Sequence, residues 1–520
     1  MAKKSPKNGK PISSIITRIE FSDRHFRKAQ FPTDMFYVKL ANRILPLMTR
    51  ALDGFPGKTQ KLTRTVTLNI VSYLEDLVSQ AGIWQAFVAI CRKRYGKAIP
   101  FYDYCPEEEN DIFEFPTPQG ISFILWYSLN TTHPGAFINP LNAAIESLAM
   151  SLMPVLCEAY EEAPDTPGRP KLRPEAECGI PLFYQVRNLC AWVVDKCYLT
   201  NLPAPAYTNT EFVDFMQALV DKATGNSDMI DFGINSIVPF NTLAGPVGAY
   251  PQEWVAEMVA CSCEPGEEAY LPILNDIKSL PYAFYGYREV GETGAVILDC
   301  DGEPMNLSSA TMNGEVMPDN VKDGMSAFMS LVYFDNAWVL NGLGMPGLPP
   351  EVFADARTQR QEELKKQHDN YGQNLRNLSG SPIGVCRNLD EYLSRFPELK
   401  DKMLEDADSS MIEKLRDTDN LLYFLNSDGN VSLLPGYATC IDLPGNPYYD
   451  PENRDGISLI LNHRISTPEM RRYIIDNNLI PDAGLTSAVS AEEGIRLFHD
   501  NIRFLNDYAG RDRVVFLTDK

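Results

Sequence analysis

The sequence predicts a mixed α+β fold with a large N-terminal helical domain, a small antiparallel β module and a C-terminal α+β region. Apolar residues recur at helical spacing over roughly the first half of the chain. At Leu280-Pro281 the period changes to short runs rich in Val, Leu, Tyr and Phe, separated by turns. The composition, 44% hydrophobic and 22% charged, is that of a globular protein, so a fully disordered or fibrous chain is excluded.

We predict five segments along the 520 residues, which suits a protein of several domains. They are a disordered basic tail over residues 1–11, a mainly helical domain over 12–280, a small antiparallel β module over 281–347, a polar connecting helix over 348–378 and a C-terminal α+β domain over 379–520.

Caps and apolar spacing define the helices of the N-terminal domain. Thr33 can cap the helix that follows it, and Asp34 suits the positive end of that helix. Thr117-Pro118 and Asn139-Pro140 each combine a cap with a proline at the first helical position. The predicted helices cover residues 33–51, 64–80, 84–95, 118–130, 139–161, 179–199, 210–223, 251–262 and 267–279, and the glycine-containing segment 225–249 is predicted to be a loop.

The β module contains four or five short apolar runs joined by turn sequences. Gly291-Glu292-Thr293-Gly294, Asp301-Gly302 and Asp335-Asn336 supply the turn chemistry. Such strands form a small antiparallel meander or a half-open barrel, and they need closure or a covering helix to bury one face.

The C-terminal half begins with a polar helix that contains TQRQEELKKQ. Beyond it, a strand over 384–386 is predicted, and Asp428-Gly429 marks the turn of a hairpin. Further helices are predicted over residues 390–396, 403–416, 467–477 and 491–508.

Charge is distributed unevenly along the chain. The net charge is −22, which disfavours general adhesion of the whole chain to nucleic acid, yet residues 1–100 carry 18 Lys and Arg against 6 Asp and Glu. The basic part therefore either meets an external acidic partner or pairs with the acidic remainder of the chain.

A cluster of cations, placed before one predicted helix and after the next, is the candidate for binding an external polyanion. Together with nearby aromatic residues, these side chains could follow a phosphate backbone and give salt-dependent binding. The candidate nucleic-acid-binding residues are Lys58, Lys61, Arg64, Arg92, Lys93, Arg94 and Lys97. The alternative interpretation is that these charges solvate helix ends and face the acidic remainder.

Eleven cysteines are present, an odd number at wide spacing, which favours reduced thiols over a disulfide framework. Cys261 and Cys263 form a CxC without a second pair nearby, so they are weak evidence for a metal. The N-terminus lacks an apolar run of signal-peptide length, and the longest apolar stretch, residues 121–129, is too short to span a bilayer. We therefore expect a soluble cytoplasmic protein without a membrane partner.

Gly342, Gly344 and Gly347 form a literal GxGxxG between a strand and a helix. A dinucleotide site needs such glycines within a βαβ unit, whereas the preceding strands are typical of hairpins and Pro349-Pro350 delays the helix. We predict a glycine-rich exit loop and no cofactor.

Other reactive residues are dispersed. The five histidines form no HExxH or HxH motif, and Arg454 occupies a ligand position in the calcium-like run from Asp450 to Asp455. The chain has no GxSxG motif of a serine hydrolase. Cys386 with His463 or His499 is the candidate pair of a nucleophile and its base. We predict no catalytic residue and no metal ligand.

Five stretches together resemble an uncharacterised bacterial family that carries a domain-of-unknown-function label and is typical of gut-type bacteria. They are PTDMFYVKLANRILPL, ISFILWYSLNT, AFYGYREVGETGAVILDCDG, MSLVYFDNAWVLNGL and NPYYDPENRDG, within roughly residues 30–485. The family's last barrel strand is richer in tryptophan than the corresponding run DNAWVLNG, in which Trp338 is the one tryptophan, so the resemblance does not imply an aromatic binding platform on that strand. The resemblance implies an architecture and a compartment, and no mechanism.

From these features we expect a non-catalytic macromolecule-binding or scaffold protein, with a protein partner favoured over nucleic acid. The modular construction and the missing catalytic motifs motivate this hypothesis. A nucleic-acid-associated protein that uses the basic N-terminal region and an enzyme of unfamiliar type remain the alternatives.

Overall fold

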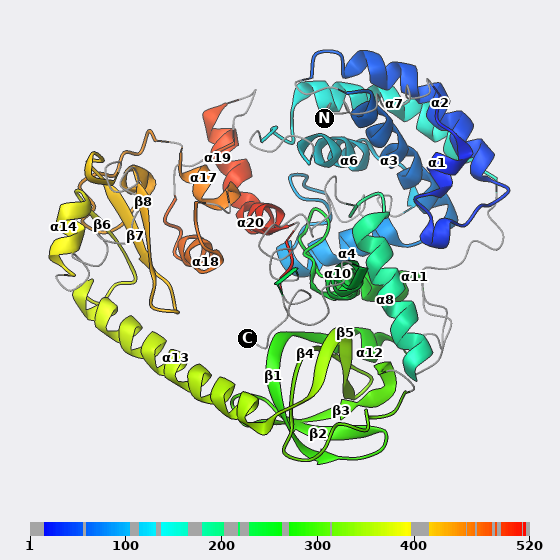
Figure 1. Cartoon of the computed structure of the whole chain (residues 1–520). Coiled ribbons are helices and arrows are strands. Elements are labelled where there is room, and N and C mark those ends of the chain that lie inside the picture. The colour runs from blue at the N-terminus through cyan, green and yellow to red at the C-terminus, as the bar shows by residue number, and fades with distance from the viewer. Residues whose placement is uncertain are drawn as a thin grey trace, which may run out of the picture.

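The computed structural model confirms the mixed α+β class (Figure 1). It describes residues 15–515 apart from 56–58, 105–113, 132–136, 165–178, 202–216, 219–227, 263–269, 313–314, 397–414, 454, 463–464, 481–483, 486–489 and 512. The predicted basic tail and most of the predicted helices 210–223 and 403–416 lie outside these residues.

The N-terminal domain is a helical body around one large hydrophobic core. α3 runs through its centre and is buried along most of its length. Thr59 and Thr117 cap α3 and α6 by accepting hydrogen bonds from Leu62 N and Gly120 N, because their hydroxyls satisfy otherwise free helix-end donors. The helices are α1 (Arg18–Ser22), η1 (Phe26–Lys28), α2 (Asp34–Ala51), α3 (Gln60–Ser79), α4 (Ile83–Tyr95), α6 (Pro118–Asn130), α7 (Ala143–Glu162), α8 (Gly179–Asp195), α10 (Asp228–Asn241), α11 (Pro251–Ser262) and α12 (Leu271–Asn275).

Three expectations for this domain were wrong. The predicted helix over 267–279 is, in its described part, only α12, because the first barrel strand already begins at Lys278. Segment 225–249 contains α10, whose Ile234, Ile237 and Val238 are buried at helical spacing although Pro239 lies in the last turn. α7 begins after Asn142, which accepts from Ala144 N, and not after Asn139. Among the described residues, α7 is also the one helix long and apolar enough to cross a membrane by length and composition, a criterion that core helices of globular proteins also meet.

The β module is a closed five-stranded barrel. The strands follow the order β1-β2-β3-β5-β4, and all neighbours are antiparallel except β3 and β5, which pair in parallel through Leu307 with Trp338 and Ser308 with Val339. This is the strand order of an OB-type barrel, and it removes the exposed edges that a meander would leave. The strands are β1 (Lys278–Val290), β2 (Gly294–Leu298), β3 (Pro304–Ser308), β4 (Ser326–Phe334) and β5 (Ala337–Leu348).

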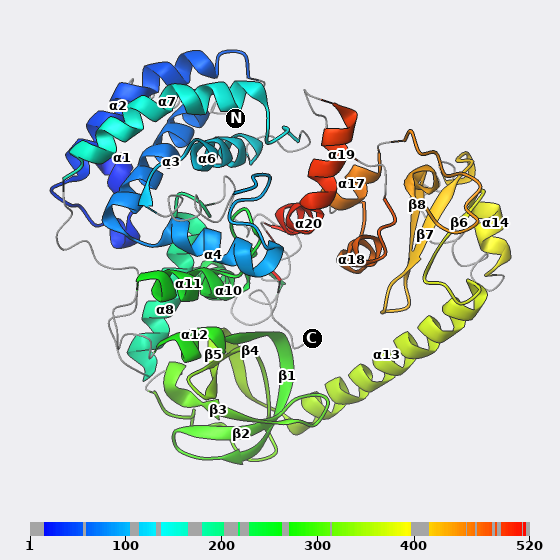
Figure 2. The same cartoon turned by 180° about the vertical axis from the view of Figure 1, so that it is seen from behind.

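A long helix, α13 (Pro350–Asn377), runs from the barrel to the C-terminal region along the outside of the molecule (Figure 2). It has no buried residue, and its 28 residues extend over about 40 Å at 1.5 Å per residue. A helix that is polar on all sides bridges parts of a protein through solvent, so α13 is a strut between two packed regions.

The C-terminal region is a three-stranded antiparallel sheet in the order β6-β7-β8, followed by short helices. Gly429 has a φ of +85° at the hairpin turn, a value that glycine adopts without strain. The elements are β6 (Ile383–Cys386), α14 (Leu389–Ser394), β7 (Leu421–Leu425), β8 (Val431–Pro435), η6 (Tyr437–Cys440), α17 (Gly456–Leu461), α18 (Pro468–Asp476), α19 (Ala491–Asp500) and α20 (Ile502–Gly510).

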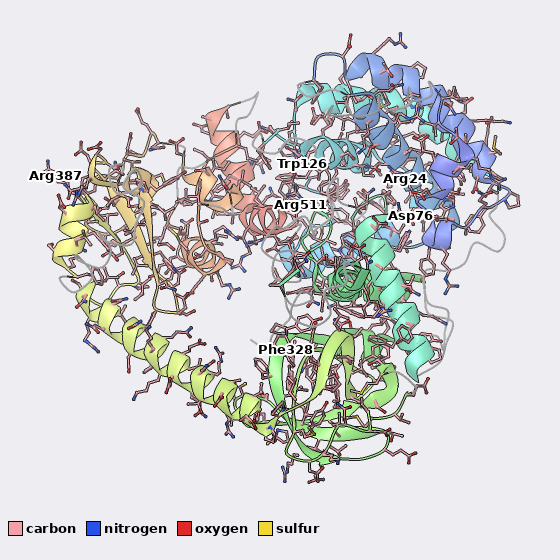
Figure 3. All side chains as sticks on the ribbon, in the orientation of Figure 1. Arg24, Asp76, Trp126, Phe328, Arg387 and Arg511 are labelled. Carbon is pink, nitrogen blue, oxygen red and sulfur yellow. The ribbon has the colours of Figure 1, made fainter. Side chains whose placement is uncertain are left out.

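The last helix, α20, returns to the N-terminal domain and closes the arrangement of domains into a ring (Figure 1). Phe504 and Tyr508 pack against Trp126, at centroid distances of 6.1 and 5.1 Å. Trp126 of α6 lies close to Arg511, which follows α20 (Figure 3). Asn501 Oδ1 accepts a hydrogen bond of 2.9 Å from Phe101 N, and Asp507 accepts one of 2.7 Å from the Tyr95 hydroxyl. Chain segments some 400 residues apart therefore share one core.

Candidate functional site

Four of the cations proposed to contact nucleic acid form ion pairs with carboxylates elsewhere in the chain. Two of the pairs reach α11 and one reaches α20, so they join the first helices to later segments. The pairs are Arg64 with Glu20, Lys93 with Glu257, Arg94 with Glu253 (2.5 Å) and with Asp507 (3.6 Å), and Lys97 with Asp103 (2.9 Å).

The other three cations differ in position. Lys61 is exposed in the first turn of α3, Arg92 is half-buried near the end of α4, and Lys58 lies outside the described residues. Nucleic-acid binding by these seven residues stays a prediction, and the observed ion pairs support the alternative, in which the basic part pairs with the acidic remainder.

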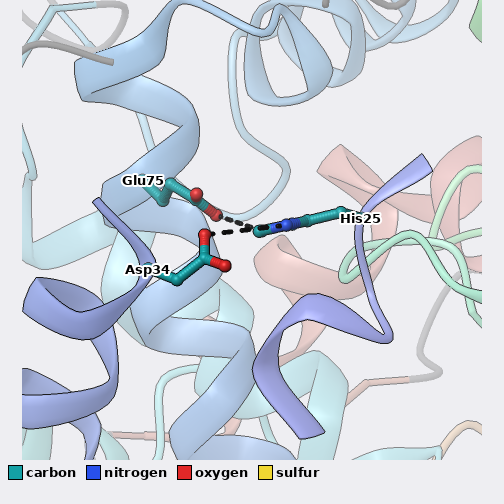
Figure 4. A group of neighbouring side chains, drawn as sticks. All are labelled: His25, Asp34 and Glu75. Atoms are coloured by element: carbon teal, nitrogen blue, oxygen red, sulfur yellow. Dashed lines mark hydrogen bonds and ion pairs between the residues drawn. The ribbon is translucent and has the colours of Figure 1, made fainter. Parts of the chain in front are cut away.

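Three ionisable side chains that are far apart in the sequence lie close together in the helical domain: His25, Asp34 and Glu75 (Figure 4). His25 stands just before η1, Asp34 opens α2, and Glu75 lies on α3 between two buried residues. One potential ligand atom of each lies within 4.8 Å of the other two, and their exposed fractions are 6%, 0% and 1%. Among the described residues, this is the one such group of metal-ligating side chains.

Hydrogen bonding determines how many protons the His25 ring carries. Nδ1 lies 2.8 Å from the Ala29 carbonyl oxygen, and Nε2 lies 3.1 Å from Glu75 Oε2. A carbonyl oxygen only accepts, so Nδ1 carries hydrogen. A proton or another cation must therefore lie between Nε2 and Glu75, because a ring lone pair and a carboxylate repel each other.

With the shared proton on His25, protein groups alone balance the charge of the two carboxylates. Asp34 Oδ2 accepts from Arg18 Nε at 3.2 Å and from Phe31 N at 3.0 Å, and Asp34 Oδ1 is 4.0 Å from His25 Nδ1. An imidazolium at His25 and the guanidinium of Arg18 offset the two carboxylates, as buried charges require.

Imidazole and carboxylate are ligands that zinc accepts, so these are the described residues that could hold a metal ion. Charge balance does not require one, and we interpret the cluster as a buried ion-pair network that fixes η1 against α2 and α3. The sequence carries one signal for it, since Glu75 interrupts the apolar face between Leu74 and Leu77.

The GxGxxG run is part of strand β5 and not an exit loop, so that prediction was wrong. Each glycine has a packing reason. A Cβ on Gly342 would stand 2.7 Å from Ser236 Cβ on α10, and one on Gly344 would stand 2.8 Å from Leu340 Cδ1. Gly347, with φ of +72°, lies against Asn320. The motif therefore lets β5 bend and approach α10 closely, and it forms no βαβ unit.

Replacing Gly342 with alanine should weaken the contact between the barrel and α10. The substitution combines a strained φ of +86° with the steric clash at Ser236, and we expect a loss of about 2–4 kcal/mol in the free energy of unfolding. Gly324→Ala is the matched control, because its φ is +82° and nothing lies within 4 Å of its added Cβ. Chemical denaturation of both variants measures the difference, and equal losses would show that no clash exists.

The candidate cysteine nucleophile is in an unsuitable environment. Burial raises the pKa of the Cys386 thiol to about 12, which disfavours the reactive thiolate. His463 lies outside the described residues. Burial likewise raises the pKa of Cys197 to about 11 and that of Cys440 to about 12. These thiols behave as packing residues.

The calcium-like run forms local turns. Asp450 Oδ1 accepts from Glu452 N at 2.9 Å, and Asn453 Oδ1 accepts from Asp455 N at 2.8 Å. Such side-chain turns account for these polar residues without an ion.

One side of the barrel is turned away from the rest of the molecule (Figure 1). Phe334 of β4 packs on Phe183 of α8 at 5.3 Å, so the helical domain covers β4 and β5. The first turn of α13 covers β1, where Phe353 occupies the space that a side chain on Gly286 would need. Strands β2 and β3 therefore present the free outer surface.

We define the β2–β3 face by the outward residues of these two strands. Val296 pairs across the strands with Asn306, and Leu298 pairs with Pro304. The alternate residues Ala295, Ile297, Met305 and Leu307 point inward and form the barrel core. The face is thus a small, mainly apolar surface on a rigid support.

Carboxylates surround the β2–β3 face. Glu289, Glu292, Asp301 and Glu303 are all exposed at its edges. The cations next to the face are Arg288 of β1, which pairs with Glu289, and Arg357 of α13, whose guanidinium lies beside Gly302. Within the part of the chain that the structure describes, no cation pairs with Glu292, Asp301 or Glu303. Residues 278–348 as a whole carry nine Asp and Glu against three Lys and Arg. Strands β2 and β3 themselves carry neither cations nor aromatic rings, which sequence-tolerant nucleic-acid binding requires.

A family model described as Protein of unknown function (DUF3843) matches residues 19–268 and 386–511. This match confirms the resemblance to an uncharacterised domain family. Its two segments are the helical body and the C-terminal region that α20 joins to it, while residues 269–385, which contain the barrel and α13, are unmatched. No curated protein and no solved structure matches the chain.

Proposed function

Because the chain belongs to the DUF3843 family, whose function is unknown, we propose from its geometry that it is a non-catalytic protein that binds another macromolecule. The helical body and the C-terminal region form a scaffold, and the barrel is the binding module. A protein partner is favoured over nucleic acid.

The observation that carries this proposal is the barrel's placement. A closed OB-type barrel presents the two strands on which this topology commonly binds oligonucleotides or oligosaccharides, and those strands face outward here. The fold alone does not determine function, so the argument rests on the exposed face and its acidic rim. An exposed surface with an apolar centre and a charged border is typical of a protein-recognition site.

The scaffold part of the proposal rests on α13 and α20. The strut holds the barrel and the C-terminal sheet apart, and α20 ties the sheet region back to the helical body. Such a ring fixes the orientation of the barrel without burying the β2–β3 face.

Site-specific photo-crosslinking tests the proposal. We expect a photoreactive residue in place of Asn306 to capture a polypeptide in the cells that naturally produce the chain. The matched control places the same residue at Lys39, which is exposed on α2, far from the barrel in the fold (Figure 2). Protease and nuclease digestion followed by mass spectrometry identifies the adduct.

The outcomes separate the candidate functions. A polypeptide captured at Asn306 and not at Lys39 supports the proposal. Capture of nucleic acid at either position would favour the alternative based on the basic N-terminal residues, and capture at neither would contradict a macromolecular role for the barrel.

A further inference from the structure

The β2–β3 face has a chemical character that restricts its partner. Its centre is apolar through Val296, Leu298 and Pro304, with Asn306 as a single amide. Its border is anionic at both turns, with Glu292 after β1 and with Asp301 and Glu303 between β2 and β3. A complementary surface therefore combines apolar side chains with several cations.

The geometry of the β2–β3 turn keeps its carboxylates outward. Asp299 Oδ1 accepts from Asp301 N at 2.9 Å and from Glu303 N at 2.8 Å, so Asp299 is used to build the turn. Asp301 and Glu303 are thereby held on the exposed side. At Gly302, the Arg357 guanidinium of α13 lies 2.9 Å from where a Cβ would stand, which fixes the turn against the strut.

We propose that the β2–β3 face binds a lysine- and arginine-rich polypeptide segment of a partner protein. The inference rests on the proposed function and specifies its partner class. The apolar residues of such a segment cover Val296 and Leu298, and its cations meet Glu292, Asp301 and Glu303. Charge complementarity selects this occupant, because the carboxylates around the face outnumber the nearby cations Arg288, Arg357 and Arg360, so a polyanion or an acidic segment would meet an excess of like charge.

The β2–β3 face lies in the segment that the family model does not match. The barrel and α13 form one continuous segment between the two parts of the chain that the family model matches. Association depends on ionic strength, since the contributing charges are exposed.

Fluorescence anisotropy on the full chain tests the assignment. The probe is a fluorescein-labelled peptide of Lys, Leu and Ser, and the comparison probe carries Glu in place of every Lys. We expect the basic probe to bind, to weaken as salt rises, and to lose at least tenfold in affinity with the triple variant E292K/D301K/E303K. The acidic probe should not bind.

A matched variant separates local recognition from general attraction to an acidic protein. E362K/E363K/D369K changes the net charge of the chain by the same amount, and all three positions are exposed on α13. It should alter the affinity less than twofold. Equal losses in both variants, or no binding of the basic probe, would overturn the proposed partner class.

The two experiments fail independently. If Asn306 captures a polypeptide and the basic peptide does not bind, the binding role stands and the partner class is wrong. If neither position captures a polypeptide, the proposed function itself falls.

Discussion

Replacing Phe504 with alanine should lower the free energy of unfolding by about 3–5 kcal/mol, the usual cost of removing a buried ring. Phe504 is 1% exposed and contacts Tyr95, Phe101 and Trp126 at centroid distances of 5.6, 5.4 and 6.1 Å. The cavity would lie at the joint between α20 and the helical body. Chemical denaturation measures the loss, and small-angle scattering measures any opening of the ring.

Phe115→Ala is the matched control for this substitution. Phe115 is 46% exposed and contacts Tyr160, so the same change should cost well under half as much. If Phe504→Ala cost no more than Phe115→Ala and left the scattering profile unchanged, α20 would not hold the ring closed.

The second large effect is expected at the buried His25 network. His25→Leu removes the cation between two buried carboxylates and should destabilise the protein by about 3–5 kcal/mol, because an uncompensated buried charge is costly. The double variant His25→Leu/Glu75→Met removes both partners and fills the space with apolar atoms. It should be more stable than the single variant by about 1–3 kcal/mol.

Denaturation of the wild type, both single variants and the double variant completes this cycle. Glu75→Met alone leaves the His25 ring without its acceptor at Nε2, so it should also be destabilising. Strictly additive losses would contradict a coupled ion pair and would show that the two side chains act separately.

Local signals in the sequence were sufficient for many helices and for the class of the fold. Thr117 caps α6, as its position directly before Pro118 predicts. The three cations at the end of α4 lie in the last turn of that helix. The segment 225–249, which contains α10, was predicted to be a loop because of its four glycines and scattered apolar residues. Ile234 and Ile237 are nevertheless buried on one face of a helix, which packs against the barrel. Tertiary packing outweighed local propensity there.

The remaining features depend on contacts between distant segments. Closure of the barrel requires β3 to pair in parallel with β5, a contact that hairpin signals do not indicate. The His25 network joins residues up to 50 positions apart, and Arg94 meets Asp507 across more than 400. No spacing rule predicts such meetings. Gly342 of the GxGxxG run is explained by its close approach to Ser236. Ser236 lies on α10, a helix that was not predicted from the sequence.

Hydrogen exchange of the full chain with and without the basic peptide tests the central claim most directly. If the β2–β3 face is the binding surface, amides in the turns at residues 291–293 and 299–303 should exchange more slowly in the complex. The α2, α3 and α4 helices should be unaffected. Protection confined to those helices, with unchanged exchange in both barrel turns, would contradict the assignment.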